Sequence, residues 1–247
     1  MPVVLTAVAH PDDESYPFGG LLSLLADTGW RCYVLAATVG EAGERHDGGP
    51  REALGAARAA ELAEACRVLG AEPPITWHLP DGGLAALPSL AEELAALSTT
   101  LGADVLLSFG PDGAYGHPDH VAVHRWCRAA ATVAGTALLE AAFPPGLFYP
   151  QYERCRSAGV LGDPPALRPQ DLGAAAAEIE LRLPPFLRER KRAAIAAHRS
   201  QLPCGIPEAL FPPGIVESLL EREAYVVAVD GAGAEAVRRL VAASTLP

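Results

Sequence analysis

The sequence lacks several features that would place it in a common class of protein. It contains no run of about 20 consecutive apolar residues, so we expect no membrane-spanning helix. No basic leader precedes its first apolar run, and we expect a cytoplasmic protein. It also contains no G-x-G-x-x-G, no P-loop and no G-x-S-x-G. The motifs of dinucleotide binding, of P-loop phosphate binding and of serine hydrolases with the α/β-hydrolase fold are therefore missing.

Basic residues are scarce and scattered along the chain. The 247 residues include 19 Lys and Arg against 30 Asp and Glu, which gives a formal net charge of −11. Binding to nucleic acid requires clustered Lys and Arg that neutralise backbone phosphates. We therefore expect no nucleic-acid partner and no membrane partner, while the oligomeric state, a homo-oligomer included, stays open.

The five cysteines are widely spaced, and no C-x-x-C pair occurs among them. This spacing excludes a zinc ribbon and a C-x-x-C redox motif. We expect reduced thiols that are mostly buried.

The first 143 residues alternate short β-type runs with helical segments. This order is typical of βαβ units and predicts an α/β fold, in which a Rossmann-like, mostly parallel sheet is sandwiched by helices. Runs that are apolar on both faces are expected to be buried strands. The predicted strands are 3–9, 32–39, 75–79, 104–109 and 137–143, and the predicted helices are 18–28, 50–69, 88–101 and 117–133.

Prolines cluster after residue 143 and interrupt regular structure. We predict an irregular, proline-rich cap over about 144–187, followed by C-terminal helices and a strand over 188–247, with a helix at 188–199 and a strand at 225–229. The whole of 1–247 is expected to form a single domain, with its Rossmann-like core over about 1–143.

Two clusters of imidazole and carboxylate groups each follow a predicted strand. The first is His10-Pro11-Asp12-Asp13-Glu14, and the second is His117-Pro118-Asp119-His120. Open α/β sheets bind ligands outside the carboxyl ends of their strands, so both clusters are expected at one cleft. Either cluster alone is also explained by an Asp that caps a helix and a histidine on the surface.

The residue types in these clusters suit a catalytic metal. Two imidazoles and one carboxylate form a three-ligand set that leaves positions open for water and substrate. His10 and Asp13 are three residues apart and can converge on one ion, while Asp12 lies near the metal as a general base. His117 and His120 lie one helical turn apart, so one can bind the metal while the other contacts the substrate.

Arg58 and Glu61 fall on the apolar stripe of the helix predicted at 50–69. Buried charges are costly unless they are paired or functional. We leave two alternatives open, which are an internal Arg58–Glu61 salt bridge and a role for Arg58 in binding substrate hydroxyls.

The remaining polar candidates are weaker. His124 is expected to be packed or hydrogen-bonded rather than a fourth ligand, and the isolated His46 and His78 are given no role. Asp112 is explained equally well as a residue of the cleft mouth or as part of a turn.

These motifs resemble those of the LmbE-like, or PIG-L, family of N-acetylglucosaminyl deacetylases. The resemblance covers about the first 200 residues, and residues 144–187 show no pattern of the family. The matching segments are 9–14, 116–120, 40–43, Arg58-x-x-Glu61 with Leu69-Gly70, 80–83, Lys191 and 198–201.

The resemblance implies a role for each matching residue. The zinc ligands would be His10, Asp13 and His120, with Fe²⁺ as the alternative metal. Asp12 would be the general base, and His117 would stabilise the oxyanion or assist the leaving amine. Asp119 would orient its histidine neighbour and Tyr115 would polarise the amide carbonyl. Arg58 and Asp81 would contact the sugar.

The activity that the resemblance implies is hydrolysis of an N-acetyl group from a small amino-sugar by zinc-activated water. Two alternatives stay open. One is an amidase of the same fold that acts on another N-acyl group, a thiol-sugar conjugate or an antibiotic intermediate. The other is a metal-free protein that binds a sugar or a nucleotide.

Overall fold

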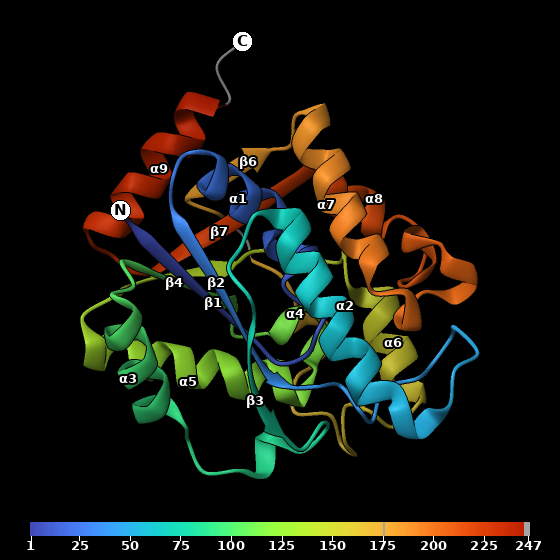
Figure 1. Ribbon diagram of the computed structural model, residues 1–247. Coiled ribbons are helices and arrows are strands. Elements are labelled where there is room, and N and C mark those ends of the chain that lie inside the picture. The colour runs from blue at the N-terminus through green and yellow to red at the C-terminus, as the bar shows by residue number, and fades with distance from the viewer. Residues whose placement is uncertain (175, 245–247) are drawn as a thin grey trace. The chain divides into compact units, whose positions relative to one another are not determined.

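A computed structural model describes residues 1–174 and 176–244 (Figure 1). Its contacts divide the chain into two compact units. The first comprises Met1–Asp81 and Arg182–Glu223, and the second comprises the described residues of Gly82–Leu181 and Ala224–Pro247. Each unit contains strands with helices packed against them. The prediction of a single domain is not tested by this division and stays a prediction.

The first unit contains three parallel strands in the order β3-β2-β1. Strand β1 (Val3–Val8) is buried along its whole length and pairs with β2 (Arg31–Thr38) from Val3–Arg31 to Val8–Ala36. Strand β3 (Ile75–Leu79) pairs with β2 from Leu35–Ile75 onward. The continuous apolar run of β1 predicts this position, since a strand covered on both faces has no solvent side.

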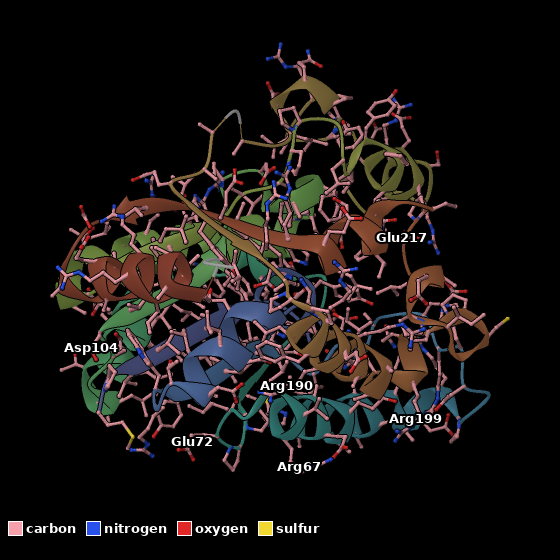
Figure 2. The ribbon with its side chains drawn as sticks, turned by 90° about the horizontal axis from the view of Figure 1, so that it is seen from above. Arg67, Glu72, Asp104, Arg190, Arg199 and Glu217 are labelled. Carbon is pink, nitrogen blue, oxygen red and sulfur yellow. The ribbon has the colours of Figure 1, made fainter. Side chains whose placement is uncertain are left out.

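The helices of the first unit are α1 (Ser15–Asp27), α2 (Leu54–Leu69), α7 (Pro185–Ala197) and α8 (Ile215–Glu221). Helix α7 packs against both α1 and α2 (Figure 1). Gly70 ends α2 with a φ of 79°, a left-handed conformation that favours glycine. The outer sides of these helices carry charged pairs, such as Arg67 with Glu64 on α2 and Arg190 with Asp27. Figure 2 labels Arg67 and Arg190.

The second unit contains four strands in the order β4-β5-β7-β6. Strand β4 (Val105–Phe109) runs parallel to β5 (Ala137–Ala141), and β5 runs antiparallel to β7 (Arg222–Val229). The fourth strand is β6 (Ile179–Arg182). The helices of this unit are α3 (Ala91–Leu101), α4 (Gly113–Gly116), α5 (Pro118–Ala134), α6 (Tyr149–Ser157) and α9 (Ala232–Ser244).

Helix α3 packs against α5, and α5 also packs against β4 (Figure 1). Short 3₁₀ turns complete the regular structure of the chain. They are Arg51–Ala53, Leu84–Ala86, Pro169–Asp171, Arg199–Gln201, Pro203–Gly205 and Pro207–Ala209.

The α/β fold and its mostly parallel sheet, both predicted from the sequence, are confirmed. The segment 144–187 is less irregular than expected, because it contains α6 and β6. Helices α8 and α9 were not predicted individually. Four of the five cysteines are buried, as expected, and Cys204 is exposed. No helix in 1–174 or 176–244 is long and apolar enough to cross a membrane.

Candidate active site

The first motif forms a tight turn between β1 and α1. The Asp13 N–H donates to the carbonyl of His10 at 3.3 Å, and the Ser15 N–H donates to the carbonyl of Asp12 at 3.0 Å. The Asp13 carboxylate in turn accepts from the His10 N–H at 2.8 Å. Asp12 has a φ of 106°, which L-residues rarely adopt. The turn therefore holds three acidic and imidazole side chains on one short loop.

The His10 imidazole lies between two carboxylates. Its Nε2 is 3.1 Å from Asp81 Oδ1, and its Nδ1 is 3.4 Å from Asp13 Oδ2. Asp81 Oδ2 accepts from the Ala42 N–H at 2.8 Å, so both oxygens of Asp81 are engaged. Burial alone would raise the pKa of Asp81, but the hydrogen bond and charge of His10 lower it to about 2. An ionised Asp81 accepts a hydrogen bond from Nε2–H of His10 and so orients the ring with Nδ1 toward the Asp13 carboxylate.

Asp12 points toward the guanidinium of Arg58, with Asp12 Oδ2 3.3 Å from Arg58 Nη2. Burial raises the pKa of Asp12 to about 7, and Arg58 opposes this rise. Arg58 is buried on α2 and also donates to the carbonyls of Gly40, at 3.0 Å, and Pro11, at 2.5 Å. The guanidinium thus joins the motif to the Gly40 loop. Its expected contact with substrate stays a prediction.

In metal-free protein, the raised pKa of Asp12 implies that Asp12→Asn is more stable than the wild type at pH 8. We expect a difference on the order of 2–4 kcal/mol, because an acid whose pKa rises on folding destabilises the folded state once it ionises. The destabilisation of the wild type by Asp12 begins above the unfolded-state pKa near 3.8 and is complete above the folded-state pKa of about 7. Urea unfolding at pH 4 and pH 8 measures it, and a gap of equal size at both pH values would contradict it.

Glu61 contacts Ser200 rather than Arg58. Its carboxylate accepts from the Ser200 N–H at 2.8 Å and from the Ser200 hydroxyl at 2.7 Å. Among the described residues, no ion pair joins Glu61 to Arg58, so the internal salt bridge considered from the sequence is not formed. Glu61 holds the segment after α7 against α2.

The second motif belongs to the second unit and follows the loop after β4. Asp112 caps α4 by accepting from the Ala114 N–H at 3.2 Å, and it accepts from the Gly173 N–H at 2.8 Å. Turn chemistry therefore accounts for Asp112. Ala114 has a φ of 66°, and the chain reverses here before α5 begins at Pro118.

His120 is held in one tautomer by the backbone. Its Nδ1 lies 3.1 Å from the carbonyl oxygen of Gly113. A carbonyl oxygen can only accept a hydrogen bond, so Nδ1 carries the proton and Nε2 keeps its lone pair. The ring stacks on Phe109 with a centroid distance of 4.2 Å and is 1% exposed. Both the tautomer and the ring plane are thus prepared for metal binding at Nε2.

His117 is fixed in the opposite tautomer. It caps α5, and its Nδ1 accepts from the Asp119 N–H at 3.2 Å, so the proton of the neutral ring lies on Nε2. The Asp119 carboxylate accepts from the N–H groups of Gly82, at 2.8 Å, and Leu84, at 2.9 Å. The Tyr115 ring lies 5.9 Å from His117 and 5.4 Å from His120. The second unit therefore brings together an Nε2–H donor, a metal-competent imidazole and a phenol.

His124 and His198 make hydrogen bonds or ion pairs within the protein. His124 Nδ1 lies 3.0 Å from the carbonyl oxygen of Phe109 and 3.4 Å from Glu140, so the expectation of a hydrogen-bonded His124 is confirmed. Sequence reasoning gave no role to Glu14 and matched His198 to the family without a role. The structure places them in contact at 2.8 Å. The signals in the sequence were the family matches at 9–14 and 198–201.

Comparison with known proteins agrees with these two motifs. Residues 5–131, about half of the chain, match the family described as PIG-L, GlcNAc-PI de-N-acetylase. The chain belongs to the PIG-L family. The matched range includes the turn after β1, Arg58, Asp81 and the start of α5, where the PIG-L resemblance was expected, and it ends before Lys191 and 198–201, where the resemblance was also expected.

One curated relative of this PIG-L chain is a 1D-myo-inositol 2-acetamido-2-deoxy-alpha-D-glucopyranoside deacetylase from Rhodococcus jostii (strain RHA1). It is 34% identical over 159 residues, which cover 54% of this chain and 54% of the relative. The chain thus spans about half the length of that relative.

Two solved structures share the fold over most of the chain. A conserved protein from Thermus thermophilus has a TM-score of 0.61 and 24% identity, and the match covers 92% of this chain and 94% of that one. An N,N′-diacetylchitobiose deacetylase from Pyrococcus horikoshii has a TM-score of 0.59 and 21% identity, with 91% and 83% covered. At these identities the likeness establishes the fold.

Proposed function

We propose that this protein is a metal-dependent hydrolase that removes the N-acetyl group of an amino-sugar. The observation that carries the proposal is the fixed orientation of two imidazoles by hydrogen bonds. Asp81 keeps the proton of His10 on Nε2, and the Gly113 carbonyl keeps the proton of His120 on Nδ1. Each ring is thus oriented through one nitrogen, as is usual for a histidine that binds a metal through the other.

The proposed ligands are the residues that the PIG-L resemblance implies, His10, Asp13 and His120. All three are buried, and two imidazoles with one carboxylate suit Zn²⁺, with Fe²⁺ as the alternative. A bound metal of this kind supplies Lewis acidity, which activates water and polarises a carbonyl.

The protein's own residues supply the proton transfers. Asp12 takes the proton of the attacking water on a carboxylate oxygen, and its raised pKa of about 7 suits a base that works near neutrality. The Nε2–H of His117 donates to the oxygen that gains charge during attack, or passes its proton to the departing amine. The phenol of Tyr115 is proposed to polarise the amide carbonyl, and Asp119 orients His117 through its N–H.

The substrate class follows from the relatives. The Rhodococcus relative is named for an N-acetylglucosamine joined to inositol, and the Pyrococcus structure for a diacetylated chitobiose. We therefore propose a small N-acetylglucosamine-type substrate, with Arg58 and Asp81 as sugar contacts. Other N-acyl groups, thiol-sugar conjugates and antibiotic intermediates are the alternatives within the same chemistry. A cytoplasmic location and the absence of nucleic-acid or membrane partners stay predictions.

Profiling the purified, metal-loaded protein against N-acyl amino-sugars tests the proposal. The panel contains N-acetylglucosamine, its α-linked inositol conjugate, diacetylchitobiose and N-propionyl and N-butyryl analogues, and release of free amine is measured. We expect turnover of at least one N-acetyl member, at a kcat/KM at least about tenfold above its N-butyryl analogue. Preference for a longer acyl group would contradict the proposed deacetylase and favour an amidase of the same fold. No turnover together with no bound metal would favour a sugar or nucleotide binder.

A further inference from the structure

The carboxylate of Glu14 is fully buried directly after the two aspartates of the first motif. It accepts three hydrogen bonds. Its Oε1 accepts from the Ser15 hydroxyl at 2.5 Å and from His198 Nε2 at 2.8 Å, and its Oε2 accepts from the Asp12 N–H at 2.9 Å. Glu14 lies at the start of α1 and faces inward, so it cannot reach a substrate itself.

His198 approaches from the other end of the chain. It follows the last residue of α7, next to Arg199, which is labelled in Figure 2, and its ring is 0% exposed. Burial lowers the pKa of a histidine, but the adjacent Glu14 carboxylate raises the pKa of His198 by more. The result is a buried ion pair between residues 184 positions apart, and the same pairing lowers the pKa of Glu14 despite its burial.

The third hydrogen bond of Glu14 acts on the peptide of Asp12. A φ of 106° is sterically disfavoured for any residue with a Cβ, so Asp12 keeps it only while its neighbours hold it. The bond from the Asp12 N–H to Glu14 Oε2 is one such restraint, and the bond from the Ser15 N–H to the Asp12 carbonyl is the other. The direction of the Asp12 side chain follows from this backbone conformation.

We infer that His198 is a positioning residue that acts through Glu14 to fix the peptide of Asp12 and thereby aim its carboxylate. The inference rests on the proposed role of Asp12 as the base. Without His198, the buried Glu14 loses its positive partner and a hydrogen bond. Its carboxylate is then held by fewer hydrogen bonds, and its hold on the Asp12 N–H weakens.

A second buried ion pair on α7 serves as the matched control. Lys191 donates to Glu223 Oε1 at 2.7 Å and to the Leu219 carbonyl at 2.6 Å, and both charged side chains are buried. Glu223 accepts from the N–H groups of Gly20 and Leu21, each at 2.7 Å. This pair holds the middle of α1 and is distinct from the three hydrogen bonds that Glu14 accepts, so its loss reports on stability.

Amide hydrogen exchange measured by mass spectrometry tests the positioning directly and needs no substrate. In His198→Ala we expect residues 10–15 to exchange at least about tenfold faster than in the wild type, while 19–22 change little. Lys191→Met should show the reverse pattern. Unchanged exchange at 10–15 in soluble, folded His198→Ala would overturn the inference.

Kinetics with the best substrate of the panel give the functional arm. We expect kcat of His198→Ala to fall about 10- to 100-fold at full metal occupancy with KM within about threefold. His198→Gln keeps an N–H donor and should recover part of the loss, and it replaces the alanine variant if that fails to fold. Lys191→Met should keep kcat within about threefold.

The two arms separate failure of this inference from failure of the proposed function. An inactive wild type overturns the proposed deacetylase, and the exchange pattern still decides whether His198 positions the turn. An active wild type with equal kcat in His198→Ala overturns the positioning role. A loss of kcat of the same size in Lys191→Met and in His198→Ala would assign the effect to stability and would also overturn it.

Discussion

Replacing Asp12 with Asn is expected to lower kcat by about 10²–10⁴-fold while the protein retains its full complement of metal. The substitution preserves shape, removes the charge that faces Arg58 and removes the ability to take a proton, and general-base catalysis contributes effects of this size. Asp12 is in contact with Arg58 rather than with the proposed ligands' donor atoms, so metal binding should survive. Steady-state kinetics and metal analysis on the same preparation measure both quantities.

The control for Asp12→Asn is the same change at an exposed position of the first unit. Asp27 ends α1 and pairs with Arg190 at 2.7 Å, so Asp27→Asn should leave kcat within about twofold. Retention of wild-type turnover in metal-loaded Asp12→Asn would disprove the assignment of the base.

Replacing His120 with Ala is expected to remove both the metal and the activity. The ring supplies one of three proposed protein ligands, and two ligands hold a catalytic metal poorly. We expect less than about a tenth of one metal per chain after gel filtration and a kcat/KM reduced by at least about 10⁴-fold. The two variants therefore give distinguishable phenotypes, since Asp12→Asn keeps the metal and His120→Ala does not.

His124 provides the matched control for His120. It lies on the same helix, α5, and its Nδ1 contacts the Phe109 carbonyl oxygen while the adjacent Glu140 lies 3.4 Å away. His124→Gln should lower thermal stability and leave the metal content unchanged. Full metal occupancy in His120→Ala, or its loss in His124→Gln, would contradict the ligand assignment.

The residues that carry the chemistry could be found from the sequence because they stand beside unambiguous strands. The run 3–9 is apolar at every position but one, which predicts a buried strand, and β1 is buried throughout. The motif that begins at His10 comes directly after this strand. Its place at the carboxyl end of the strand, where parallel sheets bind ligands, could therefore be predicted. The second motif could be placed in the same way after the run 104–109.

The partners of those residues could not be predicted, because they depend on contacts between distant parts of the chain. The sequence offers no periodicity that links Glu14 to His198 or Arg58 to Asp12. The first pair arises when α7 packs on α1, and the second when α2 packs beside the turn after β1. The contacts of Asp81 with His10 and with the Ala42 N–H were likewise not predicted, and its expected contact with the sugar stays a proposal.

The prolines after residue 143 misled the prediction of secondary structure in a specific way. Pro150 and Pro185 lie in the first turn of α6 and α7, where the missing N–H has no helical partner to lose. Proline at these positions starts a helix instead of breaking one. Strand β6 is only four residues long and alternates buried with exposed positions, so its short pattern gives little signal.

The most direct test of the account is metal-dependent amide hydrolysis by the wild-type protein. One preparation is assayed for metal content and for release of free amine from an N-acetyl amino-sugar, before and after dialysis against a chelator and after readdition of Zn²⁺ or Fe²⁺. The account predicts about one metal per chain before dialysis. Removal of the metal should abolish at least about 99% of the activity, and readdition of the metal should restore the activity. Turnover that persists at full rate in metal-free protein would contradict it.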